Sequence, residues 1–131
     1  MAESTPAQGM PTPDQVLQMM QDKMGGTLPE WPAQLKDEAP DLLLSTAMLS
    51  KGSVQRAEST IPLKYRHLMA VSAALARRQP ACARSQARMA MAEGATADEV
   101  MDAVRIARHL IAVGVIDAAA PILADLAAER G

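Results

Sequence analysis

Apolar residues recur at spacings of three and four along most of this chain, a pattern typical of helices that bury one face. The first such stretch has a clear start signal at Thr12, with Pro13 in the first helical position and Gln15 placed to close a capping box. We predict a helix from there to Gly25-Gly26. Its apolar stripe consists of Val16, Met19, Met20 and Met24.

Two shorter elements are expected in the segment that follows. Residues 28–32 predict a turn or a short helix that brings Trp31 onto the body of the protein. Pro40 and Asp41 begin another helix. Its apolar residues are Leu42, Leu43, Leu44, Met48 and Leu49. Residues 52–60 are mainly polar and predict a connection to the second half of the chain.

The second half has a more regular pattern. A helix over about 62–78 places Leu68, Val71 and Leu75 on one face. After a break at 78–80, a second helix runs over about 81–93 and stops at Gly94. Thr96 and Glu99 form another capping box, which opens a helix with Val100, Val104, Ala107 and Ile111 facing inward.

The end of the chain contains two helix-breaking residues. We expect Gly114 to end the helix that begins after Thr96. A last helix would then run from Asp117 to Glu129, with Pro121 tolerated because it lies near the start.

Composition supports an all-α fold. Hydrophobic residues make up 49% of the 131 residues, yet there is no Phe, one Trp and one Tyr. The core must therefore consist of Ala, Leu, Val, Ile and Met, which are mostly strong helix formers. We predict a bundle of about six to seven helices in a single domain over 12–131, preceded by a flexible arm over 1–11.

Charge and cysteine content exclude several classes of protein. The net charge is −2, and the arginines at 77, 78, 84 and 88 have no accompanying aromatic platform, so we expect no nucleic-acid partner. No apolar run approaches the roughly 20 residues needed to cross a bilayer, so we expect no membrane association. The N-terminus lacks the basic and apolar regions of a secretion signal. A single cysteine, Cys82, excludes an internal disulfide and favours a reducing compartment, so we expect a cytoplasmic protein.

Residues 61–123 contain an ordered set of motifs. Pro62-Leu-Lys-Tyr-Arg-His67 opens the set, a cysteine-bearing helix follows, and Glu93-Gly-Ala-Thr96-Ala-Asp-Glu99 comes next. Ile111-Ala-Val-Gly114 and an Ala-rich helix close it. The set resembles the carboxymuconolactone decarboxylase / alkylhydroperoxidase D-like (AhpD-like) superfamily. The resemblance implies a helical bundle, a homo-oligomer (a trimer or a hexamer), and a pocket near the subunit contacts.

The site of that superfamily is largely replaced in this chain. When Gly94-Ala-Thr96 is laid on the family's glycine turn, Cys82 falls on the second cysteine of its Cys-x-x-Cys motif. Gln79 then replaces the first cysteine, and Gln86 replaces the histidine. His67 stands where the resemblance would place a proton-relay glutamate.

Cys82, His67 and Gln86 are the candidate catalytic residues. Cys82 lies in the first turn of its helix, where the helix dipole favours a thiolate, but the chain contains no second thiol to resolve an oxidised Cys82. The alternative is that Cys82 is a small buried hydrophobic residue. His67 is a base, a metal ligand or a neutral hydrogen-bonded histidine, and Gln86 binds a ligand or is purely structural. His109 is expected to complement the C-terminal end of a helix dipole.

Three functions remain open on this basis. The first is a thiol-dependent antioxidant (peroxidase-type) protein that uses Cys82 and an external thiol reductant. The second is a non-catalytic ligand-binding or assembly protein on the same fold, and the third is a non-redox decarboxylase-like or lactone-type enzyme with His67 as base. No pair of His or Cys residues has metal-ligand spacing, and we expect Met69, Met89 and Met91 to be core residues. We therefore expect neither a metal nor a cofactor.

Overall fold

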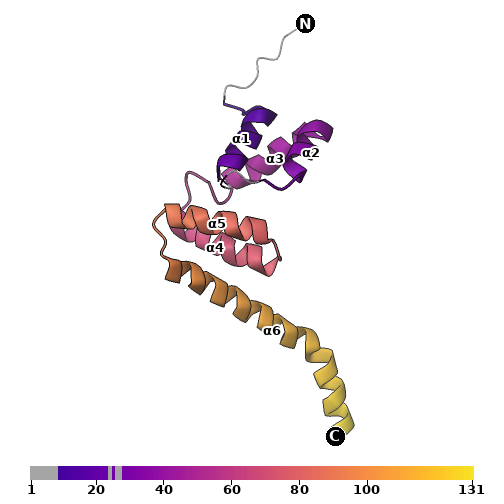
Figure 1. The fold of residues 1–131 in the computed structure, drawn as a ribbon. Coiled ribbons are helices and arrows are strands. Elements are labelled where there is room, and N and C mark those ends of the chain that lie inside the picture. The colour runs from indigo at the N-terminus through magenta and orange to yellow at the C-terminus, as the bar shows by residue number, and fades with distance from the viewer. Residues whose placement is uncertain (1–8, 24, 26–27) are drawn as a thin grey trace. The chain divides into compact units, whose positions relative to one another are not determined.

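A computed structural model describes residues 9–23, 25 and 28–131, and within these residues it contains six helices and no strand (Figure 1). The predicted all-α class is confirmed. The chain divides into two compact units, residues 1–61 and 62–131, which are described separately below. The single domain over 12–131 stays a prediction. Most of the expected flexible arm, residues 1–8, lies outside the described residues.

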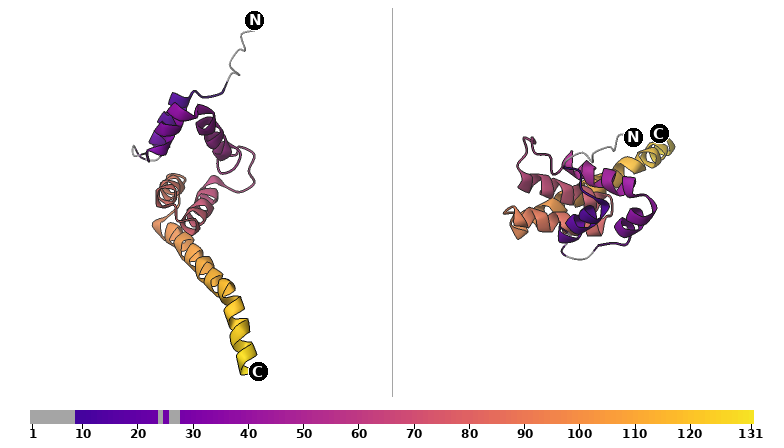
Figure 2. Two further views of the ribbon diagram at one scale, coloured as in Figure 1. Left: turned by 90° about the vertical axis from the view of Figure 1, so that its right-hand side faces the viewer. Right: turned by 90° about the horizontal axis from the view of Figure 1, so that it is seen from above.

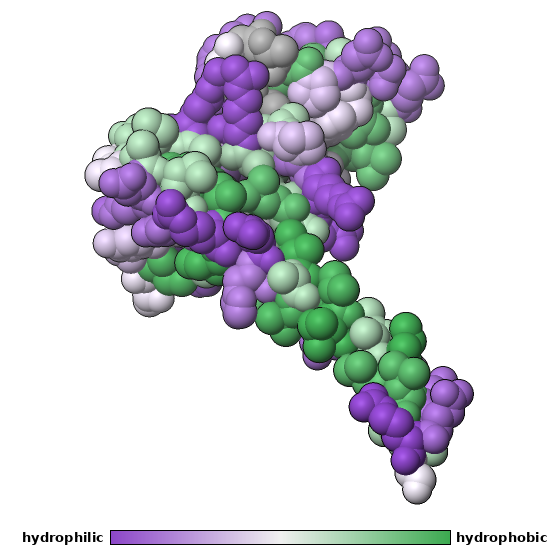
Figure 3. All heavy atoms as spheres, turned by 60° about the horizontal axis from the view of Figure 1, so that its bottom comes forward, coloured by the Kyte–Doolittle hydropathy of each residue, from purple (hydrophilic) through white to green (hydrophobic). Residues whose placement is uncertain are grey.

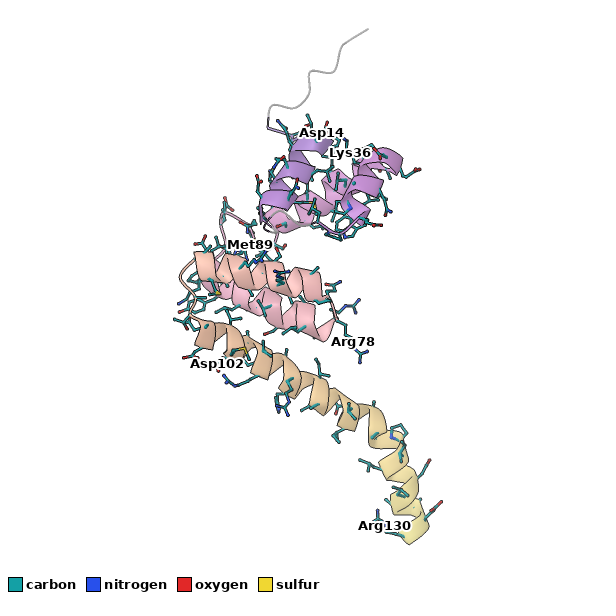
Figure 4. The ribbon with its side chains drawn as sticks, in the orientation of Figure 1. Asp14, Lys36, Arg78, Met89, Asp102 and Arg130 are labelled. Carbon is teal, nitrogen blue, oxygen red and sulfur yellow. The ribbon has the colours of Figure 1, made fainter. Side chains whose placement is uncertain are left out.

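The first unit contains three short helices. They are α1 (Pro13–Lys23), α2 (Trp31–Glu38) and α3 (Pro40–Lys51). The predicted capping box at the start of α1 is confirmed: Thr12 N–H donates to Gln15 Oε1 (2.9 Å), and Gln15 N–H donates to Thr12 Oγ1 (3.2 Å). An ion pair between Asp14 and Lys36 joins α1 to α2 (Figure 4). Met24 and Gly26, which were expected at the end of α1, lie outside the described residues.

The core of the first unit is small. Val16 on α1, Pro32 on α2 and Leu43 on α3 are fully buried. Of the apolar residues predicted on α3, Leu43 alone is buried, whereas Leu42 and Leu49 are exposed. This unit therefore depends on very few side chains for its hydrophobic stabilisation.

The second unit begins with a helical hairpin. It consists of α4 (Leu63–Ala76) and α5 (Pro80–Ala92), which lie side by side in Figure 1 and in both views of Figure 2. The turn between them contains Arg78 in the left-handed conformation, with φ +55°. Most of the buried residues of the unit are alanines, and such small side chains let neighbouring helices pack closely. They are Ala74, Ala83, Ala90, Ala95, Ala103 and Ala107.

Helix α6 (Ala97–Arg130) completes the second unit and packs on α4 through its N-terminal part. The predicted capping box is present, because the Thr96 side chain accepts from Glu99 N–H and the Glu99 side chain accepts from Thr96 N–H. Ser72 Oγ on α4 donates to the carbonyl of Ala103 (2.8 Å). These contacts fix the start of α6 against the hairpin.

The predicted end of this helix at Gly114 is wrong, as is the separate helix over 117–129. Helix α6 runs unbroken for 34 residues through Gly114 and Pro121. One interior glycine destabilises a helix by about 1 kcal/mol, and the remaining hydrogen bonds of a helix of this length can offset that cost. Proline at 121 has no N–H to donate to the carbonyl of Asp117, and such a residue can bend a helix without ending it. Figure 1 shows that the C-terminal part of α6 is bent.

The inward face predicted for α6 is correct only for its first turns. Ala103 and Ala107 are buried and Val100 and Val104 are half-buried, but Ile111 is 46% exposed. Beyond Ala107 every residue is exposed, apart from the half-buried Ala119. Figure 3 shows apolar residues along much of this exposed length. By length and composition alone α6 could cross a membrane, so the expectation that no apolar stretch is long enough is wrong.

Candidate functional site

A buried histidine and a glutamine pair across the α4–α5 hairpin. His67 on α4 is 2% exposed, and its Nδ1 lies 2.7 Å from Oε1 of Gln86 on α5. With an amide oxygen as the acceptor, the imidazole donates from Nδ1. The hairpin thus orients His67 and fixes its tautomer.

Cys82 lies on the same helix as Gln86, in the first turn. Pro80 occupies the first helical position, no side chain caps the helix at Gln79, and the first turn contains no acidic residue. Backbone N–H groups in the first turn of a helix have no partner inside the helix, so the local potential favours a negative charge. The Cys82 side chain is exposed. In this chain the alternative of a small buried hydrophobic residue is therefore wrong.

The three candidate residues lie on one hairpin. Cys82 and Gln86 are four residues apart on α5 and share a face, and Gln86 contacts His67. Gln79 is exposed at the start of α5. The role expected for His109 is wrong, because this exposed residue lies in the middle of α6 rather than at its C-terminal end. Among residues 9–23, 25 and 28–131, no three His, Cys, Asp or Glu side chains lie close enough to hold a metal ion.

A second cluster of polar residues was not predicted from the sequence. Lys64 Nζ on α4 lies 3.2 Å from Oε1 of Glu99 on α6, and 4.8 Å from the centre of the Tyr65 ring. The hydrogen bond from Thr96 N–H, followed by the contact with Lys64, lowers the pKa of Glu99. The same ion pair raises the pKa of Lys64. The sequence indicated only the capping role of Glu99. Its contact with Lys64 could not be predicted from a local pattern, because the two residues are 35 positions apart.

A cavity of about 410 Å³ lies beside this cluster, between α4 and α6. Leu68, Met69 and Ile106 provide apolar walls, while Tyr65, Glu99 and Asp102 provide polar groups. Asp102, labelled in Figure 4, also accepts a hydrogen bond from Arg105 at 2.7 Å. Neither Cys82, His67 nor Gln86 lines this cavity. The unit therefore contains two separate candidate sites, one on the hairpin and one between α4 and α6.

We expect Glu99→Gln to destabilise the protein at neutral pH and to have a smaller effect in acid. Because the pKa of Glu99 is lowered by folding, this carboxylate stabilises the fold above its ordinary pKa of 4.5, and the contribution is lost as the pH falls through the lowered value. The part due to Lys64 is lost only above 10.5, as the pH rises through its raised pKa. Thermal unfolding followed by circular dichroism at pH 7 and pH 3 measures the difference.

Asp98→Asn is the matched control, since it removes a neighbouring first-turn carboxylate that makes no capping-box contact. We expect its effect at pH 7 to be smaller than that of Glu99→Gln. An equal loss at pH 7 and pH 3 for Glu99→Gln would contradict the assignment of the pH-dependent contribution to Glu99.

Comparison with known proteins identifies one family, and the match includes parts of both units. A family model described as the carboxymuconolactone decarboxylase family matches residues 40–125. The matched range begins at Pro40, the first residue of α3, and extends into α6, so it includes both candidate sites. A search of curated proteins finds no significant match.

Proposed function

The chain belongs to the carboxymuconolactone decarboxylase family, and on that premise we propose that it is a thiol-dependent peroxidase working through Cys82 and an external thiol. The observation that carries the proposal is the exposure of Cys82 in the first turn of α5. A thiol there is accessible to a hydroperoxide and lies in a first helical turn, where backbone N–H groups have no partner inside the helix and no acidic residue is present. Arg78 and Arg84, which are both exposed and close in sequence, add positive charge.

The proposed cycle needs one cysteine and two equivalents of an outside thiol. The Cys82 thiolate attacks the terminal oxygen of a hydroperoxide, the O–O bond breaks, and the products are Cys82 sulfenic acid and, after protonation, an alcohol. A first thiol condenses with the sulfenic acid, forming a mixed disulfide and releasing water. A second thiol attacks that disulfide, which frees the Cys82 thiol and yields the oxidised reductant as its disulfide. The proposal places the protein in the cytoplasm, where such thiols are abundant.

In this proposal His67 and Gln86 are positioning residues. The bond between them joins the face of α5 that also bears Cys82 to the buried side of α4. At 2% exposure, His67 is poorly placed to meet a substrate, which weighs against the non-redox enzyme with His67 as base. Gln86 is only partly exposed and cannot exchange protons at neutral pH, so we assign it no acid–base step.

Cys82→Ser is expected to remove all peroxide consumption above that of the thiol alone. The hydroxyl of serine cannot form a sulfenic acid, so no first step remains. The measurement follows disappearance of hydrogen peroxide and of cumene hydroperoxide with dithiothreitol or glutathione as reductant, and mass spectrometry identifies the Cys82 mixed disulfide. Wild-type protein should also react with iodoacetamide at pH 7 faster than free glutathione does.

Ala81→Ser is the matched control, because it places a serine one residue away in the same exposed turn and leaves the thiol intact. It should retain wild-type turnover. If wild-type protein consumes both peroxides no faster than the free thiol does, the peroxidase proposal is wrong.

The cavity between α4 and α6 supports a second candidate function, the binding of a small ligand without catalysis. Its apolar walls and polar rim are the usual make-up of a small-molecule site, and its volume of about 410 Å³ is within the range of such sites. Equal behaviour of wild-type protein and Cys82→Ser in the peroxide assay would favour this candidate.

A further inference from the structure

The exposed part of α6 continues a face that is buried at the start of the helix. Over its first turns this face packs on α4 through Ala103 and Ala107. Leu75, one residue before the end of α4, lines a groove with Val104 and Ile111. Farther along, the same face of α6 carries apolar side chains that no other part of the second unit covers, including Val115 (64% exposed) and Ile122 (61% exposed).

This continuing face has a pattern that reads the same in both directions. Its members are spaced by three, four, three, four and three residues, and they are Arg108, Ile111, Val115, Ala118, Ile122 and Asp125. The spacing is symmetrical about its midpoint, and the two ends carry opposite charges. We call these six residues the α6 stripe. All six are exposed.

We propose that the α6 stripe pairs with the α6 stripe of a second copy of this chain, antiparallel and about a two-fold axis. In this arrangement Arg108 of each copy faces Asp125 of the other, and Ile111 faces Ile122. Val115 faces Ala118 near the axis, where the small alanine leaves room for close approach of the two helices. The end of each α6 then lies along the groove beside Leu75 of the other copy. Two ion pairs form and both apolar faces are covered.

Charge distribution favours a second copy over a lipid bilayer as the occupant of this face. The exposed stretch of α6 contains three carboxylates, Asp117, Asp125 and Glu129, and carboxylates are costly in a bilayer core. In the antiparallel pair Asp125 meets an arginine, whereas Asp117 lies on the opposite side of α6 and stays in water. Arg108 and both aspartates are thereby paired or solvated.

The pairing also gives a specific form to the expected homo-oligomer. A two-fold contact produces a dimer, or a hexamer in which three such dimers assemble, but it does not produce an isolated trimer. The inference rests on α6 alone and is independent of any role for Cys82.

Charge exchange at the two ends of the α6 stripe tests the pairing. Arg108→Glu places two carboxylates opposite each other at both ends of the interface, and Asp125→Arg places two cations there. We expect each single variant to weaken self-association about tenfold or more, as measured by sedimentation velocity over a concentration series. The double variant Arg108→Glu/Asp125→Arg restores both ion pairs with reversed polarity, and we expect it to associate within a few-fold of wild type.

Asp117→Arg is the matched control, because it makes the same charge change as Asp125→Arg on the opposite side of α6. It should leave association unchanged, and circular dichroism should show equal helix content in all variants. A wild-type protein that stays monomeric, or a double variant that is as weak as the single ones, would overturn the pairing. Wild-type protein that floats with phosphatidylcholine–phosphatidylglycerol vesicles and does not self-associate would identify a membrane as the occupant instead.

Discussion

Leu43→Ala is expected to lower the free energy of unfolding of the first unit by about 2–5 kcal/mol. Leu43 is 0% exposed, and among the described residues of this unit only Val16 and Pro32 share its degree of burial. Removing its side chain therefore leaves a cavity in a core with few other contacts to collapse into it. Urea unfolding followed by fluorescence of Trp31 measures the loss, because the one tryptophan of the protein lies in α2 of the same unit.

The matched control for this change is Leu49→Ala on the same helix. Leu49 is 73% exposed, so its truncation removes little buried area, and we expect a change within about 0.5 kcal/mol. Similar losses for the two variants would mean that α3 packs on a different face. If only Leu43→Ala is destabilising, the result confirms that Leu43 is buried and that Leu49 is exposed.

Gln86→Leu is expected to destabilise the second unit by about 1–3 kcal/mol. The change deprives the buried Nδ1–H of His67 of its acceptor at 2.7 Å, and a buried donor that loses its partner keeps the cost of its desolvation. Thermal unfolding followed by circular dichroism measures the effect.

The double variant His67→Leu/Gln86→Leu provides the test of mechanism. Because it removes donor and acceptor together, we expect it to be more stable than Gln86→Leu alone. Losses that simply add would contradict a direct interaction between the two side chains. Neither variant touches the Cys82 thiol, so peroxide turnover measured on both also reports whether the pair holds α5 in a productive position.

Helix starts were predictable from the sequence, and helix ends in α6 were not. The capping boxes at Thr12 and Thr96 are local, since each involves residues only three apart, and both are present in the structure. The effect of Gly114 and Pro121 depends on the remaining hydrogen bonds of a 34-residue helix. Each breaker costs only a few kcal/mol at most, which a long helix can outweigh.

The candidate site was predictable in part. The resemblance to the family brought Cys82, His67 and Gln86 together, and the hydrogen bond between His67 and Gln86 is the geometric basis of that grouping. The exposure of Cys82 depends on what packs over the first turn of α5, which periodicity does not reveal. The pairing of Lys64 with Glu99 also depends on how α4 crosses α6, and no local signal in the sequence encodes it.

The turn at Arg78 places an arginine where a glycine would be less strained. A side chain in the left-handed region costs of the order of 1 kcal/mol, and glycine avoids that cost. Arg78 lies in the turn between α4 and the helix that bears Cys82, and Figure 4 shows it at the end of the hairpin. A permanent cation therefore stands at a strained corner of the backbone, and replacement by glycine would relax the backbone while removing the charge.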